Sequence, residues 1–235
     1  MSLMPARGIL LDIEGTTTPI AFVYDILFPF ARSRAAEYLK SADLTELKRE
    51  YDQDVLAGMS PPPWPDGPVG YVHWVMDRDR KSTALKNIQG KIWLEGYKSG
   101  ELRGEVFPDV VPALERWRQS HIDVRIFSSG SVLAQRLLFS TTNSGDLTKY
   151  LNGYFDTTTG PKNDATSYAR IAESFGIPAG DILFISDVTR ELDAARTAGM
   201  QTLLCVRPGN HAQPPHNHAV VTSFAEVHAQ TGKKS

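Results

Sequence analysis

The sequence has little cysteine and no excess of charge of either sign. Its single cysteine, Cys205, lies among apolar neighbours and cannot form an intramolecular disulfide, so we expect a buried thiol and a reducing compartment. The 25 Lys and Arg residues nearly balance the 27 Asp and Glu residues, and the formal net charge is −2. Because neither sign dominates any long stretch, the sequence does not support a surface for nucleic acid or an anionic membrane.

Long apolar runs are also missing. No uninterrupted apolar run approaches the ~20 residues of a membrane span, and residues 1–8 lack the apolar core of a signal peptide. We therefore expect a cytoplasmic protein with no membrane partner. Because no exposed apolar stripe can be assigned, we also expect a monomer.

Short apolar runs alternate with helical patterns over much of the chain. Buried strands are predicted at residues 9–13, 124–127, 182–185 and 202–206. Helical periodicity covers residues 110–118, 132–139, 165–175 and 191–198. Strands that alternate with helices predict an α/β fold with a doubly wound parallel sheet.

Residues 19–103 break this rhythm, because they show helical periodicity but no strand. Apolar residues predicted to share helical faces are Phe22, Ile26 and Phe30; Leu44, Leu47, Tyr51 and Val55; Val72, Val75 and Met76; and Leu85, Ile88 and Ile92. The proline-rich residues 60–68 predict a stiff loop between these helices. We expect a core of residues 1–18 and 104–235, with a mostly helical cap of residues 19–103 inserted after the first strand.

Polar residues follow the predicted strands, where an open α/β sheet binds its ligands. Asp12 and Glu14 leave the first strand, Ser128 and Ser129 follow the second, and Asp187 follows the third. Lys162 precedes the helix at residues 165–175. Each feature alone has a simple structural reading: a turn, a helix cap, acids at a helix start, or a surface lysine.

Together these residues make a chemically coherent set. An aspartate can act as a nucleophile, hydroxyls and N–H groups at a helix start bind phosphate, and acidic side chains bind a hard divalent cation. Their order along the chain resembles that of the haloacid dehalogenase superfamily. Segments that resemble its acireductone-forming enolase-phosphatases of methionine salvage are DIEGTT (12–17), PDGPVGYVHWVMDRDRKSTALK (65–86), QGKIWLEGYKSGEL (89–102), FSSGS (127–131) and ISDVTRELDAARTAGM (185–200).

The resemblance implies a bifunctional enzyme that uses one Mg²⁺ per chain and a small phosphorylated substrate. It would convert 2,3-diketo-5-methylthiopentyl-1-phosphate, through its enol phosphate, into 1,2-dihydroxy-3-keto-5-methylthiopentene and phosphate. Asp12 would be the nucleophile and Glu14 the acid and base. Ser128, Ser129 and Lys162 would hold the phosphoryl group, and Mg²⁺ would bind Asp12, the Glu14 carbonyl and Asp187. Glu14 replaces the aspartate that the superfamily usually has at this position.

Several alternatives stay open at this point. The chain could be a phosphatase of the same fold for another small phosphate ester, a haloacid dehalogenase, or a degenerate fold that serves as an interaction module. The base of the enolisation is not identified, although Glu14 and a cap residue are candidates. Glu191 is expected to orient Lys162 or a water, and Asp193 to lie on a helix surface. His211, His216 and His218 are expected in a solvated loop rather than at a zinc ion.

Overall fold

The structure is a computed structural model that describes residues 6–78, 80 and 82–228. The chain divides into two compact units, residues 1–23 with 103–235 and residues 24–102. We call the first the core unit and the second the helical unit, and describe each by itself.

The core unit is built on a six-stranded parallel sheet with the strand order β3-β2-β1-β4-β5-β6. The strands are β1 (Gly8–Leu11), β2 (Asp123–Phe127), β3 (Gly153–Phe155), β4 (Ile182–Ser186), β5 (Gln201–Cys205) and β6 (Ala219–Val221). The predicted doubly wound parallel sheet is confirmed. The sequence pattern missed β3 and β6, because each has only three residues.

The central strand β1 and the first four residues of β4 contain no polar side chain, because both faces of these strands are covered. All four residues of β1 and all five of β4 are buried. Leu11 of β1 lies opposite Ile126 of β2 and Ile185 of β4. The three strands therefore end side by side, and the residues that follow them meet at one edge of the sheet.

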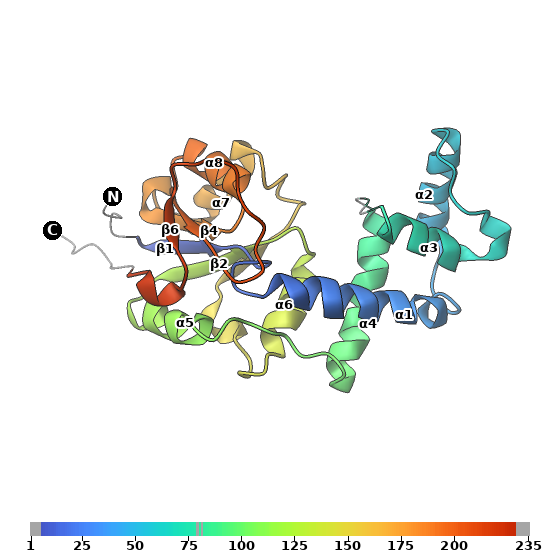
Figure 1. Ribbon diagram of the computed structural model, residues 1–235, viewed down its shortest axis with the longest axis horizontal. Coiled ribbons are helices and arrows are strands. Elements are labelled where there is room, and N and C mark those ends of the chain that lie inside the picture. Colours follow the sequence, from blue (N-terminus) through green and yellow to red (C-terminus); the bar gives the residue numbers. More distant parts are fainter. Residues whose placement is uncertain (1–5, 79, 81, 229–235) are drawn as a thin grey trace. The chain divides into compact units, whose positions relative to one another are not determined.

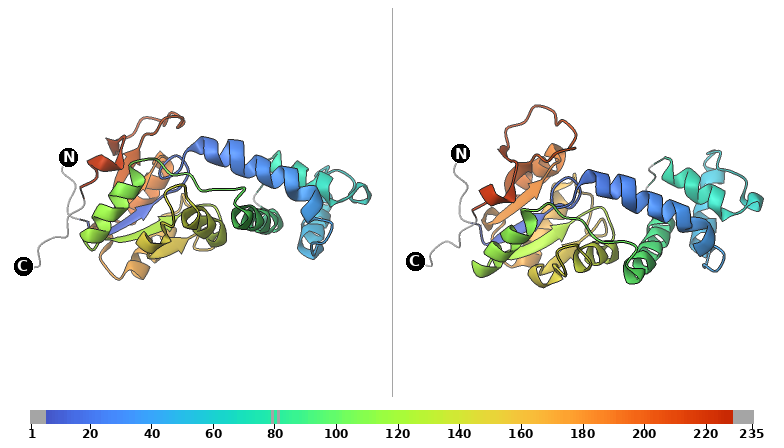
Figure 2. Two further views of the ribbon diagram at one scale, coloured as in Figure 1. Left: turned by 90° about the horizontal axis from the view of Figure 1, so that it is seen from below. Right: turned by 60° about the horizontal axis from the view of Figure 1, so that its bottom comes forward.

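Helices cover both faces of this sheet (Figures 1 and 2). α7 (Ala165–Phe175) and α8 (Thr189–Thr197) pack together on one face, and α5 (Val110–Gln119) and α6 (Val132–Ser140) lie on the other. Short 3-10 helices complete the unit: η3 (Thr148–Tyr150), η4 (Ala179–Asp181) and η5 (Phe224–Glu226).

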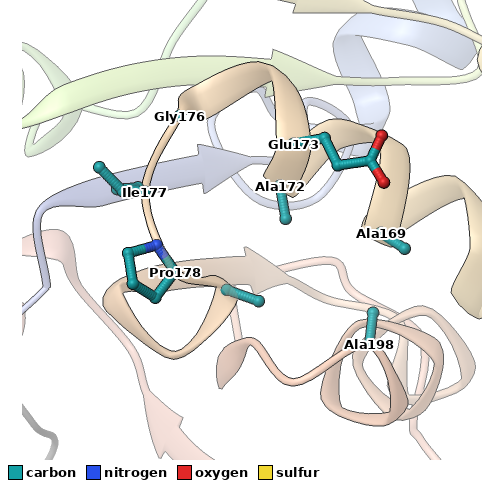
Figure 3. A pocket seen from close by; sticks show the side chains of 8 residues that line it. Ala169, Ala172, Glu173, Gly176, Ile177, Pro178 and Ala198 are labelled. Carbon is teal, nitrogen blue, oxygen red and sulfur yellow. The ribbon is translucent and has the colours of Figure 1, made fainter.

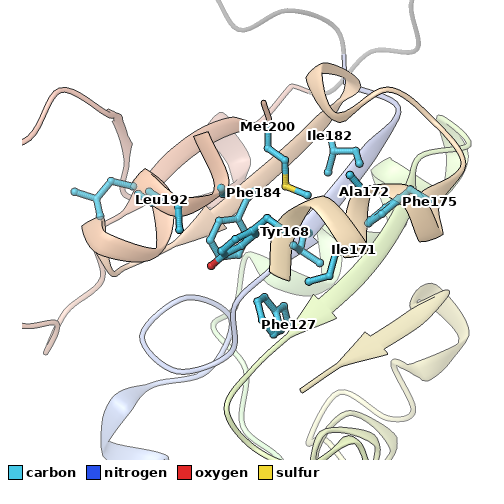
Figure 4. Packing of buried hydrophobic residues seen from close by; sticks show 13 residues of the cluster. Phe127, Tyr168, Ile171, Ala172, Phe175, Ile182, Phe184, Leu192 and Met200 are labelled. Carbon is cyan, nitrogen blue, oxygen red and sulfur yellow. The ribbon is translucent and has the colours of Figure 1, made fainter. Parts of the chain in front are cut away.

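A cluster of aromatic side chains anchors α7 to the sheet (Figure 4). The Tyr168 ring lies 5.4 Å from the ring of Phe127 and 5.1 Å from that of Phe184, measured between centroids. All three residues are fully buried. This packing fixes the start of α7, and with it the loop that carries Lys162.

The helical unit consists of α1 (Phe28–Tyr38), α2 (Thr45–Leu56), the 3-10 helix η2 (Trp64–Asp66), α3 (Pro68–Met76) and α4 (Thr83–Ser99). α4 contacts all three other α-helices and is sharply bounded. Ser82 caps its start by accepting a hydrogen bond of 2.9 Å from the Leu85 N–H group, and Gly100 ends it in the left-handed conformation. The unit's apolar core contains Ala31, Leu47, Val72 and Ile88.

Two predicted apolar positions are wrong. Residues 22–27 form a π-helix, η1 (Phe22–Leu27), in which Phe22 and Leu27 are buried whereas Ile26 is 44% exposed. The prediction assumed the 3.6-residue turn of an α-helix, whereas the hydrogen bonds of a π-helix join residues five apart and give a wider turn. Val55 is also exposed, near the end of α2. Among the described residues, no helix has the length and apolarity that crossing a membrane requires.

Candidate active site

Asp12 follows β1 directly, and three donors hold its buried carboxylate. Its Oδ1 accepts hydrogen bonds from the Ile13 N–H group at 2.7 Å and from Lys162 Nζ at 2.6 Å. Its Oδ2 accepts one from the Ser186 hydroxyl at 3.0 Å. The carboxylate is therefore fixed in both position and rotation before any substrate arrives.

Lys162 stands between two carboxylates. Its Nζ lies 2.6 Å from Asp12 Oδ1 and 2.6 Å from Glu191 Oε2. The Tyr168 hydroxyl donates to the Lys162 carbonyl at 2.7 Å, which ties the lysine backbone to the core. Burial acts to lower the pKa of Lys162, but the charges of Asp12 and Glu191 outweigh it and raise the pKa, so the ammonium stays protonated.

Asp187 and Glu191 complete an acidic cluster at the start of α8. Burial, together with the nearby charge of Asp12, raises the pKa of Asp187 to about 8 and that of Glu191 to about 7. Lys162 acts in the opposite direction on both groups but does not offset this effect. The cluster has more negative charge than its one ammonium neutralises.

This excess charge suits a hard divalent cation. No three His, Cys, Asp or Glu side chains converge on one point within the described residues. The predicted ligands differ from such a group, because they are two carboxylates, Asp12 and Asp187, and the backbone carbonyl of Glu14. An additional buried acceptor, Oδ1 of Asn210, has no partner among the described residues and lies beside Asp187. The oxygen ligands that these residues offer therefore fit Mg²⁺.

Glu14 lies in a tight turn that follows β1. β1 ends at Leu11, two residues before the predicted end, so alternation along a strand does not place Asp12 and Glu14 on the same side. In this turn the Gly15 N–H group donates to the Thr18 carbonyl at 2.8 Å. Gly15 has a φ of +69°, and a Cβ there would collide with the Asp187 carboxylate, so glycine is required. The charge of Glu14 also acts on Asp187.

Ser128 and Ser129 begin the loop between β2 and α6. The Ser128 hydroxyl accepts a hydrogen bond from the Gly130 N–H group at 3.1 Å. Gln135 of α6 donates from Nε2 to the carbonyls of Gly130 and Phe155, both at 2.8 Å. Gln135 thus fixes the loop from the side of α6. Ser129 is exposed. Because β2 neighbours β1, the loop begins at the same sheet edge as Asp12.

The loop after β5 supports the turn that follows Asp12. Arg207 Nε donates to the Thr16 carbonyl at 3.2 Å, and Asn210 Nδ2 donates to the Gly15 carbonyl at 2.9 Å. Sequence reasoning missed both residues, along with Ser186 and Gln135 as partners of the site. Ser186 could have been suspected because it ends β4 beside Asp187. Nothing in the pattern connects residues 207 and 210 with residues 15 and 16.

The histidine-rich loop differs from its prediction at one position. His218 is buried, and its Nδ1 and Nε2 lie 2.9 Å from Thr202 Oγ1 and 3.0 Å from Asp193 Oδ1. His218 therefore ties β6 to β5 and α8 instead of standing in solvent. Burial, assisted by the charge of Arg196, lowers its pKa. Cys205 is fully buried, as predicted, and burial raises the pKa of its thiol to about 12.

A surface hollow of about 460 Å³ lies away from these groups (Figure 3). Alanines of α7, residues 176–179 and Ala198 line it. These residues precede β4 and β5, so the hollow lies at the edge where the strands begin. The carboxylates lie where the strands end, and the hollow has no part in their chemistry.

The parallel sheet and the buried Asp12 carboxylate at its edge are typical of one class of hydrolases. A family model described as haloacid dehalogenase-like hydrolase matches residues 6–199. The crystal structure of the UTR4 protein from Saccharomyces cerevisiae superposes with a TM-score of 0.77 and is 33% identical, covering 94% of this chain and 100% of that one.

Two curated relatives narrow this class. Enolase-phosphatase E1 of Synechococcus elongatus is 48% identical over 231 residues, which span 93% of this chain and 96% of the relative. Enolase-phosphatase E1 of Sorangium cellulosum is 46% identical over 233 residues, which span 97% and 99%. The chain therefore belongs to the enolase-phosphatase E1 family of haloacid dehalogenase-like hydrolases. The resemblance predicted from its motifs is confirmed.

Proposed function

We propose that this chain is the enolase-phosphatase of methionine salvage. It converts 2,3-diketo-5-methylthiopentyl-1-phosphate, through the enol phosphate, into 1,2-dihydroxy-3-keto-5-methylthiopentene and inorganic phosphate. The observation that carries the proposal is the buried Asp12 carboxylate, held between Lys162 and Ser186 in a chain of this family.

Asp12 is the nucleophile of the phosphatase step. Its carboxylate oxygen forms a bond to phosphorus while the bond from phosphorus to the substrate oxygen breaks, which gives an aspartyl-phosphate and an enol. Water then attacks this phosphorus, releases phosphate and restores the carboxylate. Lys162 carries the positive charge that offsets Asp12 and the phosphoryl oxygens, and the Ser128 hydroxyl and the Ser129 N–H group donate to those oxygens.

Glu14 supplies the proton in the first displacement and removes one in the second. As an acid it protonates the departing enol oxygen, and as a base it takes a proton from the attacking water. Its place two residues after Asp12 supports this role, as does the action of its charge on Asp187.

One divalent cation, Mg²⁺, completes the site. Asp12, the Glu14 carbonyl and Asp187 would hold it, and when bound it supplies positive charge beside the transferred phosphoryl group. Asp187 has the buried, charge-crowded carboxylate that such a cation stabilises. The carbonyl of Glu14 can serve whether residue 14 is Glu or Asp, so the unusual side chain does not affect this ligand.

We also propose that residues 19–103 act as a cap on the core of residues 1–18 and 104–235. The apolar clusters of the helical unit support this, because they give it a packed interior of its own. The protein would act as a monomer in the cytoplasm. The buried Cys205 thiol, which makes no disulfide, agrees with a reducing compartment.

A substrate panel tests the assignment. With Mg²⁺ present, the diketo methylthiopentyl phosphate should exceed other small phosphate esters in kcat/KM by at least ~100-fold, because binding energy from the whole substrate assists the reacting centre. Equal rates across the panel would instead support a general phosphatase of this fold. Turnover that EDTA does not reduce would show that the reaction does not need the cation.

Asp12→Asn tests the nucleophile in the same assay. We expect hydrolysis to fall by at least ~10³-fold because the amide cannot form the covalent intermediate. Circular dichroism should show an unchanged fold. Activity above a tenth of that of the wild type would exclude Asp12 as the nucleophile.

A further inference from the structure

Asn210, in the loop after β5, has an amide whose orientation is set by its surroundings. Its Nδ2 donates to the Gly15 carbonyl at 2.9 Å and to the Cys205 carbonyl at 3.2 Å. Both N–H bonds of the amide are thus used on carbonyl acceptors. A flipped amide would place its oxygen against two other oxygens, so the donors set Oδ1 on the opposite side.

That oxygen lies in an unusual position. It is shielded from solvent and accepts no hydrogen bond from the part of the chain that the structure describes. It lies 3.0 Å from the point that a Cβ of residue 15 would occupy, and the Asp187 carboxylate lies even closer to the same point. Two acceptors therefore share one small region with no donor between them. A buried acceptor without a partner is costly, so a donor is expected there.

We propose that Asn210 Oδ1 accepts a hydrogen bond from a water molecule in the hydration shell of the cation beside Asp187. Asn210 is then a positioning residue of the cation site. The inference rests on the cation site of the proposed function. Mg²⁺ keeps several of its waters when it binds to proteins, and such waters are strong donors. An oxygen acceptor from the loop after β5 satisfies one of them.

The same side chain also fixes the turn that carries a predicted ligand. By holding the Gly15 carbonyl, Asn210 restrains the peptide unit next to the one that contains the Glu14 carbonyl, which is the predicted ligand. The amide thus has two separable roles: Nδ2 holds the turn, and Oδ1 receives the water. A test must distinguish loss of the water acceptor from loss of the restraint.

Binding of Mn²⁺ to the full chain, without substrate, gives that test. Electron paramagnetic resonance of free Mn²⁺ yields the dissociation constant, and ¹⁷O relaxation of water yields the residence time of the waters on bound Mn²⁺. Asn210→Ala should weaken binding by about tenfold, the scale seen when partners of metal ligands are removed. It should also shorten the residence time, because one bound water loses its acceptor.

Gln213→Ala is the matched control from the same loop. Its Oε1 accepts from the Thr189 N–H group at 3.0 Å and the Thr189 hydroxyl at 3.2 Å, so its loss frees the loop without removing an acceptor beside Asp187. We expect its Mn²⁺ affinity and water residence time to match those of the wild type. Asn210→Ser, too short to reach the same point, serves if the alanine variant does not fold and should show the same two changes.

Three results would overturn the inference. Unchanged Mn²⁺ affinity in Asn210→Ala would show that Asn210 Oδ1 does not contribute to binding of the cation. Weaker binding with the wild-type residence time would show that the amide only restrains the turn. If the wild type itself binds no Mn²⁺, the proposed cation site fails, and this inference fails with it.

Discussion

At the residue scale, the candidate site brings buried charges of opposite sign together. One ammonium, that of Lys162, lies 2.6 Å from each of two carboxylates, and a third carboxylate stands nearby. The order of these residues along the sequence was enough to predict that Asp12, Lys162 and Asp187 act together. The sequence did not predict that Ser186 holds the Asp12 carboxylate, because a serine at a strand end has no distinguishing pattern.

Lys162→Met tests this balance. Without the ammonium, phosphate release should fall by about 10²–10³-fold, the typical effect of losing one charge-stabilising donor. Steady-state assays with saturating Mg²⁺ measure it. Lys98→Met is the control, since the Lys98 ammonium pairs with Glu95 at 3.4 Å on an exposed surface and should have no effect. A loss below tenfold in Lys162→Met would contradict the role of the ammonium.

Asp187→Asn should stabilise the protein when EDTA is present. Its buried carboxylate is repelled by the charges of Asp12, Glu191 and Glu14. The amide of the variant carries no charge and removes this repulsion. A gain of about 2 kcal/mol would raise the melting temperature by roughly 4–8 °C for a chain of this size.

The pH dependence of that gain follows from the sign of the shift. The pKa of Asp187 is raised to about 8 in the folded protein, so the wild type loses stability as the pH rises from about 4 towards 8. The stability gap between Asp187→Asn and the wild type should therefore be wider at pH 8 than at pH 5. Calorimetry at both values measures it, and a variant that melts below the wild type at pH 8 would contradict the account.

At the element scale, strands and helices with strong periodicity were predictable, whereas elements held by tertiary contacts were not. β1 and the first four residues of β4 form apolar runs and were found, although the ends of these strands differ by one or two residues. β3 and β6 depend on pairing with longer neighbours. The hydrogen bonds of the π-helix η1 join residues five apart, and a search for α-helical faces does not detect its wider turn.

Gln135 shows how one helix positions a loop. Gln135→Leu would remove the side-chain donor of the Gly130 and Phe155 carbonyls and leave Phe155 with the Ser128 N–H group alone, at a cost of about 1–3 kcal/mol. The looser Ser128–Gly130 loop should raise the inhibition constant of inorganic phosphate by about tenfold, if 1.4 kcal/mol of this cost appears in binding. Competitive inhibition and thermal melting measure the two effects.

Ser140→Ala is the control at the other end of α6. It removes only the hydrogen bond of 3.2 Å that the Ser140 hydroxyl donates to the Leu137 carbonyl within the same helix. Phosphate inhibition should stay at the wild-type value. An unchanged inhibition constant in Gln135→Leu would show that the loop keeps its shape without the amide.

At the scale of the whole molecule, segments distant in sequence meet around Asp109 and Arg207. Asp109 Oδ2 accepts from Arg207 Nη1 at 2.8 Å and from the Ser223 hydroxyl at 2.9 Å. Arg207 also donates to the carbonyls of Thr16 and Thr222. This pair of the buried Arg207 and the partly buried Asp109 joins α5, the turn after Asp12 and the C-terminal segment. The alternation of strands and helices predicted the sheet, but it carried no information about such long-range polar contacts.

Acid should weaken this junction. Burial acts to raise the pKa of Asp109, but the hydrogen bond and charge of Arg207 outweigh it and the pKa is lowered. The carboxylate therefore stabilises the fold above the unfolded pKa of about 4, and this stability is lost as the pH falls through the folded value. Asp109→Asn should be less stable at pH 7 by about 1–3 kcal/mol, and the difference should shrink towards pH 3.

Urea unfolding at both pH values measures this difference. Asp52→Asn is the control, because Asp52 pairs with Lys48 on an exposed helix surface and should change stability by at most ~0.5 kcal/mol. A gap between Asp109→Asn and the wild type that stays constant from pH 7 to pH 3 would contradict the charge argument.

The most direct test of the central claim follows two signals in one cuvette. Wild-type protein with Mg²⁺ and 2,3-diketo-5-methylthiopentyl-1-phosphate should produce the ultraviolet absorbance of the enol before or together with free phosphate, and EDTA should abolish both signals. Release of phosphate without any enol, or neither signal from a protein that hydrolyses other phosphate esters, would contradict the assignment to methionine salvage.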